Sequence, residues 1–272
     1  MKKRIITGAA LIIFLIFVLL LNMPIVDTLF IFSISIIGMY EYNRAFKSAG
    51  YNVIPFIGYL SCIPILFLGM NLDSQVIVLL ARILITFILM YTFIYSILRK
   101  LKTTIIEVAI TVLSFIYIPF MFSFLKLILM MDNGRLLIWF VIMGAFACDT
   151  FAYLIGRKFG KRKLCPEVSP KKTIEGAIAG IIGVILAYII IYAIAKLVLN
   201  INLNIFVVIL MSIVSGIIGQ FGDLSASSIK RFCKIKDFGS IMPGHGGVLD
   251  RCDSIMFVAP LVYIILKVYM FM

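Results

Sequence analysis

The chain has 272 residues, of which 63% are hydrophobic, and its mean hydropathy is +1.17. Soluble domains are about 45–50% apolar, so this composition excludes a soluble protein, which could not bury the excess. The net charge of +13 would favour nucleic-acid binding in a soluble protein. Here the cations lie between apolar runs, which indicates membrane topology first, an anionic ligand second, and no nucleic acid.

The apolar runs have the length of about 18–25 residues that crosses a hydrocarbon core of about 30 Å. We therefore predict an all-α, polytopic integral membrane protein with about nine transmembrane helices and a cytoplasmic N-terminus. The first run is longer than a signal-peptide core and no A-x-A-like site follows it, so a retained helix is predicted. The nine predicted spans are 5–22, 26–46, 53–70, 75–98, 104–130, 136–156, 174–199, 202–222 and 254–271.

With the N-terminus inside, most of the 25 Lys and Arg residues fall on cytoplasmic segments, as the positive-inside rule requires. The five cysteines show no C-x-x-C spacing, so we expect apolar fillers, with neither disulfides nor thiolate metal sites. We predict one integral membrane domain over 1–272. Residues 1–135 are expected to be mainly transmembrane scaffold, and residues 136–272 to be the catalytic half, with cytoplasmic loops 157–173 and 223–253.

The loop 223–253 mixes four aspartates with a cluster of lysines and arginines and the only histidine of the chain, His245. Carboxylates hold hard divalent cations, and Lys and Arg hold phosphate oxygens. Gly244, Gly246 and Gly247 let backbone N–H groups approach an anion closely. This mixture is typical of metal-assisted phosphoryl or nucleotidyl transfer.

The loop 157–173 and the helix before it indicate the same chemistry. Asp149, Tyr153 and Gly156 follow at i, i+4 and i+7, so we expect them on one helix face. Ser169 before Pro170 predicts a helix N-cap, which would place Lys171 and Lys172 in a first turn that seats an anion. Three glycines of the following span predict close helix packing, with no substrate contact. They are Gly176, Gly180 and Gly183.

The run 227–253 resembles the signature of the phosphatidate cytidylyltransferases, also called CDP-diacylglycerol synthases. Met242 and Cys252 depart from its usual residues, and both keep a weakly polar side chain. The matching positions are Ser227, Ile229, Lys230, Arg231, Lys236, Asp237, His245, Gly246, Gly247, Val248, Asp250, Arg251, Cys252 and Asp253. The segments 149–160 and 169–175 are also similar to this family.

The resemblance implies that CTP and phosphatidic acid give CDP-diacylglycerol and pyrophosphate, with Mg²⁺ required, with or without a second cation. We expect Asp223 and Asp250 to bind the metal, with Asp253 as a further ligand. The expected catalytic set is Asp223, Asp250, Lys230, Arg231, His245 and Arg251. The expected substrate-binding set is Lys171, Lys172, Ser227, Ser228, Lys236, Gly246 and Gly247. Lys236 and Asp237 are also expected to form an ion pair that orders the loop.

Two other functions compete with this reading. A transporter would carry ionisable residues at mid-membrane, and the first five spans have very few. A membrane-bound CTP-dependent polyprenol kinase needs the same metal and nucleotide phosphates, and it would release CDP in place of pyrophosphate. A CDP-alcohol phosphotransferase would need a D-G-x-x-A-R pattern, which the sequence lacks. The resemblance further implies a homodimer in a bacterial cytoplasmic membrane, with its active site facing the cytoplasm.

Overall fold

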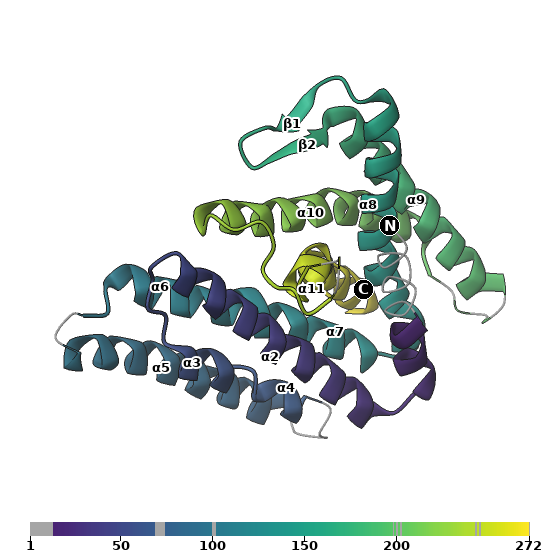
Figure 1. Cartoon of the computed structure of the whole chain (residues 1–272). Coiled ribbons are helices and arrows are strands. Elements are labelled where there is room, and N and C mark those ends of the chain that lie inside the picture. The colour runs from purple at the N-terminus through teal and green to yellow at the C-terminus, as the bar shows by residue number, and fades with distance from the viewer. Residues whose placement is uncertain are drawn as a thin grey trace. The chain divides into compact units, whose positions relative to one another are not determined.

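A computed structural model describes residues 13–68, 74–99, 102–197, 199, 201, 203–242, 244 and 246–271 (Figure 1). His245 and the start of the predicted first span lie outside these residues, and residues 13–21 of that span are helical. Among the described residues, the regular secondary structure consists of helices and one two-stranded antiparallel sheet. The prediction of an all-α, polytopic membrane protein is confirmed.

Within the described residues, seven helical segments are long and apolar enough to cross a membrane. They are α2 (Pro24–Ser48), α5 (Ser74–Leu98), the joined segment of α6, η1 and α7, and then α8 (Gly134–Phe159), α9 (Ile174–Leu197), α10 (Ile205–Phe232) and α11 (Leu249–Phe271). In the joined segment, α6 (Ile105–Phe115) leads through the π-helical turn η1 (Ile116–Phe120) into α7 (Met121–Leu129). Pro119 lies in η1, where the wider turn accommodates its missing N–H group. The count of nine spans stays a prediction.

The predicted span 53–70 is not one continuous helix. It contains α3 (Pro55–Leu60) and α4 (Pro64–Phe67), separated by a turn over 61–63. Each begins with a proline, which is favoured in a first helical turn and disrupts a helix interior. Pro64 therefore ends one helix and starts the next, which counting apolar residues alone does not reveal.

The contacts divide the chain into two compact units. Unit 1 comprises residues 1–127 and 232–250, and unit 2 comprises residues 128–231 and 251–272. In unit 1, α2 packs against α3, α4 and η1, and α6 packs against α3 and α5. A capping box at Thr104 and Glu107 starts α6.

In unit 2, α8 packs along α9, and the hairpin of β1 (Lys163–Cys165) and β2 (Ser169–Thr173) joins them (Figure 1). The predicted packing role of the glycines is confirmed. A Cβ at Gly176 would lie 2.7 Å from the Ala152 carbonyl oxygen, and one at Gly180 would lie 3.0 Å from the Cys148 carbonyl oxygen. At Gly183 a Cβ would lie 2.5 Å from the Phe151 ring. Only glycine allows this approach of α9 to α8.

Candidate active site

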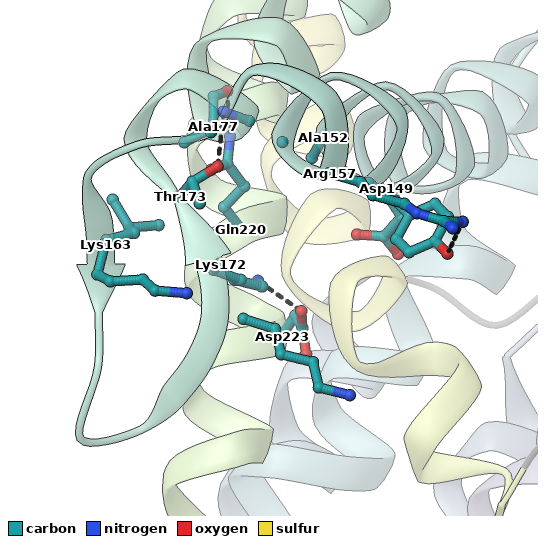
Figure 2. Close-up of a pocket in the computed structure, with 15 residues that line it drawn as sticks. Asp149, Ala152, Arg157, Lys163, Lys172, Thr173, Ala177, Gln220 and Asp223 are labelled. Carbon is teal, nitrogen blue, oxygen red and sulfur yellow. Dashed lines mark hydrogen bonds and ion pairs between the residues drawn. The ribbon is translucent and has the colours of Figure 1, made fainter.

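A cavity of about 590 Å³ lies in unit 2, where α8, the β1–β2 hairpin, α9 and α10 meet (Figure 2). Its volume is in the range of small-molecule sites, about 300–1,000 Å³. Its charged lining consists of Asp149, Arg157, Lys163, Lys171, Lys172 and Asp223. The cavity thus combines four cations with two carboxylates, which suits an anionic ligand accompanied by a metal ion.

One face of α8 forms part of the cavity wall. Asp149, Tyr153 and Gly156 all line the cavity, which confirms that they share a helix face. One turn after Tyr153, Arg157 donates from Nη1 to the Tyr153 hydroxyl at 3.2 Å. Asp149 lies well inside α8, so it is not a helix cap.

The hairpin corrects the predicted helix start at Ser169. Ser169–Thr173 is the strand β2, and α9 begins at Ile174. The cap is Thr173, whose Oγ1 accepts a hydrogen bond from the Gly176 N–H at 3.2 Å. Pairing of β2 with β1 keeps Pro170 in an extended conformation, so Lys171 and Lys172 reach the cavity from a strand.

An ion pair between β2 and α10 crosses the cavity wall. Lys172 Nζ lies 2.5 Å from Asp223 Oδ2, and each side chain is about one quarter exposed (24% and 25%; Figure 2). One turn further along α10, Ser227 donates from Oγ to Asp223 Oδ1 at 3.5 Å. Gln220 fixes the preceding turn, because its Nε2 donates to the carbonyls of Ala177 and Gly216 at 3.0 Å each. Asp223 therefore sits on a backbone that is held against α9.

Three aspartates of unit 2, Asp149, Asp223 and Asp253, lie close together near the C-terminal part of α10. A Cβ at Gly222 would lie 2.6 Å from the Asp253 carbonyl oxygen, so α11 closely approaches α10 beside Asp223. The carboxylates of Asp149, Asp223 and Asp253 repel one another, and nearby cations offset this repulsion. Lys172 and Arg251 attract Asp149, and Lys230 attracts Asp253. Asp149 and Asp223 thus bring two carboxyl groups into the basic cavity, and Asp253 lies close to both of them.

Asp250 lies in unit 1, at the first turn of α11. Its Oδ2 accepts hydrogen bonds from the Phe238 N–H at 2.8 Å and the Gly247 N–H at 2.9 Å. Gly246 has a φ of +85°, which glycine adopts without strain and which turns the chain toward α11. One glycine, Gly247, therefore donates its N–H to a carboxylate of the chain itself, and the approach of glycine N–H groups to a bound anion stays a prediction.

The remaining predicted residues have different surroundings. Arg231 donates from Nε to the Val168 carbonyl oxygen at 3.2 Å, which ties α10 to the hairpin. Ser228 and Lys236 are exposed, and no ion pair joins Lys236 to its described neighbour Asp237. The predicted loop 223–253 is shorter than expected. Because α10 continues to Phe232 and α11 starts at Leu249, the residues Asp223, Lys230 and Asp250 are all helical.

The five cysteines are free thiols. Burial raises the pKa of the Cys233 thiol to about 11, so this side chain is neutral and unreactive at neutral pH.

No group of three or more His, Cys, Asp or Glu side chains is placed to hold a metal ion within the described stretches of the chain. The donor types nevertheless suit a hard cation, because Asp149 and Asp223 bring carboxylate oxygens to one cavity. A metal shared by Asp223, Asp250 and Asp253 stays a prediction.

Sequence reasoning singled out the helix face of Asp149 but assigned no site role to Asp149, Arg157, Lys163 or Gln220, which line the cavity. It missed Glu41 of α2 altogether. Asp149 shares its helix face with Tyr153 and Gly156, and this signal was available in the sequence. Gln220 falls in an apolar run, and its role depends on a carbonyl of another helix. The carboxylate of Glu41 accepts hydrogen bonds from the N–H groups of Val248 and Leu249, which no local pattern indicates.

Comparisons with known proteins show the family of the chain. A sequence profile described as "Cytidylyltransferase family" matches residues 2–269. A "Phosphatidate cytidylyltransferase" of Bacillus subtilis is 32% identical over 275 residues, covering 99% of this chain and 98% of that protein. A protein of the same name from Staphylococcus epidermidis is 35% identical over 274 residues, covering 98% and 99% of the two chains. The chain therefore belongs to the phosphatidate cytidylyltransferase branch of the cytidylyltransferase family.

Proposed function

We propose that this protein transfers the cytidylyl group of CTP to phosphatidic acid, which gives CDP-diacylglycerol and pyrophosphate. The observation that carries the proposal is the cavity of unit 2, in which four cations and two carboxylates meet at the ends of apolar helices. A site that joins a nucleotide to a lipid phosphate needs positive charge for both anions. It also needs to lie within reach of the bilayer surface.

The chemistry requires no general base. The nucleophile is a phosphate monoester oxygen of phosphatidic acid, whose second pKa of about 6 leaves it largely ionised at neutral pH. This oxygen forms a bond to the α-phosphorus of CTP as the bond to the β-phosphate oxygen breaks, and pyrophosphate leaves with the electron pair. The main obstacle is repulsion between the two anions, so the protein acts by neutralising and aligning them.

The side chains of unit 2 fit these tasks. Lys171, Lys172, Lys163 and Arg157 line the cavity and would hold phosphate oxygens of CTP and of the lipid. Lys230 and Arg251 lie where they offset the charge of the aspartates, and they would hold phosphates in the same way. His245, Ser227 and Ser228 remain candidates for hydrogen bonds to a phosphate oxygen.

We further propose a requirement for Mg²⁺. Asp223 and Asp250 would hold the ion, with Asp253 as a further ligand and phosphate oxygens of the substrate completing its coordination. When bound, the metal would neutralise phosphate charge and polarise the phosphorus. Release of Lys172 from Asp223 would free one carboxylate oxygen and one ammonium group together.

The decisive experiment uses purified protein in detergent with phosphatidic acid, Mg²⁺ and CTP labelled in its cytosine ring, with and without EDTA. We expect label to enter the lipid phase and pyrophosphate to appear, and EDTA to abolish both. In Asp250→Asn, we expect loss of at least about 99% of the activity, because its carboxylate is proposed to act directly on the cation. Asp132→Asn, an exposed aspartate that lies outside the matching positions of the signature, is the control and should retain full activity.

Two outcomes would contradict the proposed reaction, and a third would contradict the proposed role of Asp250. Folded wild-type protein that transfers no label would exclude this reaction. Release of CDP in place of pyrophosphate, with phosphate transferred to a lipid acceptor, would identify a CTP-dependent lipid kinase instead. Activity of Asp250→Asn near the wild-type value at saturating Mg²⁺ would remove Asp250 from the metal site.

A further inference from the structure

A buried carboxylate of α2 contacts the start of α11 in unit 1. Glu41 is completely buried, with an exposed fraction of 0%. Its Oε1 accepts a hydrogen bond from the Val248 N–H at 3.0 Å, and its Oε2 accepts one from the Leu249 N–H at 2.9 Å. Both oxygens are therefore used, and both hold backbone groups immediately before Asp250.

The segment between α10 and α11 is shaped to receive this carboxylate. Gly239 and Gly247 lie against Glu41, and a Cβ at either position would overlap its carboxylate oxygens. Replacing either glycine would displace Glu41 or the segment itself. The chain therefore encloses the carboxylate with backbone atoms from two separate points of the segment.

A second set of contacts connects this arrangement to Asp250. Arg44, one turn after Glu41 on α2, donates from Nη2 to the Phe238 carbonyl oxygen at 3.1 Å. The N–H groups of Phe238 and Gly247 both donate to Asp250 Oδ2. The helix α2 thus contacts the start of α11 directly through Glu41. Through Arg44 it also contacts Phe238, whose N–H donates to Asp250.

The carboxylate of Glu41 suits this task better than a neutral amide would. The first N–H groups of a helix have no partner within it, and they favour a negative charge. A carboxylate offers two acceptors to two donors, whereas an amide would turn its NH₂ group toward one of these N–H groups. That N–H would then be buried without a partner.

We propose that Glu41 is a positioning residue of this enzyme, which fixes the first turn of α11 and thereby the orientation of Asp250. The catalytic importance of Asp250 rests on the proposed function. The hydrogen bonds from Val248 and Leu249 to Glu41 do not depend on that function. Glu41 itself contacts no substrate in this scheme. Its effect on the reaction passes through the backbone of residues 247–249.

The experiment compares Glu41→Gln and Glu41→Ala with the wild type and with Glu107→Gln. Glu107 is the matched control, since it is a buried carboxylate of the same unit that also accepts backbone hydrogen bonds at a helix N-terminus. Amide hydrogen exchange of the segment 246–251 is measured in detergent, together with kcat and KM for CTP in the label-transfer assay. The exchange rate reports the stability of the first turn of α11 and does not require the protein to be active.

We expect Glu41→Gln to speed exchange in the segment 246–251 at least about tenfold, which corresponds to the loss of one buried hydrogen bond. We expect kcat to fall at least about tenfold, with KM for CTP changing by less than about threefold, because misplaced catalytic groups mainly slow the chemical step. Glu41→Ala, which removes both acceptors, should have a larger effect on both quantities. Glu107→Gln should leave exchange in this segment unchanged.

Unchanged exchange at 246–251 in Glu41→Ala would overturn the proposal, as would faster exchange with wild-type kcat. Equal effects of Glu107→Gln and Glu41→Gln on kcat would reduce the role of Glu41 to general stability and would also overturn it. Full activity of Asp250→Asn beside an impaired Glu41→Gln would show that Glu41 does not act through Asp250. Wild-type protein without transfer activity would refute the proposed function alone, since exchange would still test the helix contact.

Discussion

The carboxylate of Asp223 is the charged group of the cavity whose loss should be most informative. Asp223→Asn keeps the size of the side chain but removes its charge, so both cation binding and the attraction for Lys172 are lost. We expect kcat to fall at least about 100-fold in the label-transfer assay at saturating CTP and Mg²⁺. Asp132→Asn, an exposed aspartate in the turn before α8, should keep wild-type activity. A loss smaller than about tenfold in Asp223→Asn would contradict its role.

At the residue scale, the sequence predicted some charged groups of the cavity that lie in dense polar segments, but it did not assign Arg157 and Lys163 to the site. Lys171, Lys172 and Asp223 were found in this way, and the structure brings them to one cavity. Glu41 was not found, because it is an isolated acid in an apolar helix. Its partners are backbone groups some 207 residues away along the chain. Residue types in a local pattern cannot indicate a partner that has no side-chain chemistry.

The contact between α8 and α9 gives a test at the scale of an element. In Gly176→Ala, the new Cβ would meet the Ala152 carbonyl oxygen at 2.7 Å and the Gly156 Cα at 3.1 Å, so the two helices must move apart. We expect the melting temperature in detergent to fall by roughly 4 °C or more and transfer activity to fall with it, because Gly176 also lines the cavity. Ile178→Ala on the exposed face of α9 is the control. An unchanged melting temperature in Gly176→Ala would refute the packing argument.

Helix ends were the least predictable elements. Hydropathy ended one span at residue 222, yet α10 continues to Phe232 because its backbone hydrogen bonds do not depend on an apolar side chain. At Ser169 the local capping signal was outweighed by strand pairing, and by Thr173, which caps α9 from four residues later. The glycines of α9 were predicted correctly, since their spacing on one helix face is a local property.

The arrangement across the membrane can be tested with the native thiol of Cys165. Cys165 is partly exposed in β1, and the predicted topology places it in the cytoplasm, while Asp132 before α8 is on the other side. A membrane-impermeant maleimide should label wild-type protein in inside-out vesicles and not in intact cells, and should label Asp132→Cys in intact cells. Cys165→Ala identifies the labelled site. Labelling of Cys165 in intact cells would reverse the predicted orientation.

For the whole molecule, composition was enough to predict the class. An apolar excess gathered into runs of membrane-crossing length leaves no other arrangement, and seven long apolar helices are present among the described residues. Composition could not predict that residues 232–250 pack with the first half of the chain, in unit 1. That association depends on contacts such as the ring of Phe232 stacked on Tyr51, which are tertiary and have no periodic signal.

In the ion pair of Lys172 and Asp223, each side chain competes with a proposed ligand of the other: Lys172 with a metal ion for Asp223, and Asp223 with a phosphate for Lys172. Under the proposed roles, a divalent cation bound to Asp223 would have to displace Lys172, and a phosphate bound to Lys172 would have to draw it away from the same carboxylate. A metal–nucleotide complex breaks the pair once and satisfies both halves. Under the proposed roles, metal and nucleotide therefore bind with positive thermodynamic coupling, and each raises the affinity for the other by the same factor. Such a site discriminates against inorganic phosphate and against bare metal ions before any base is read.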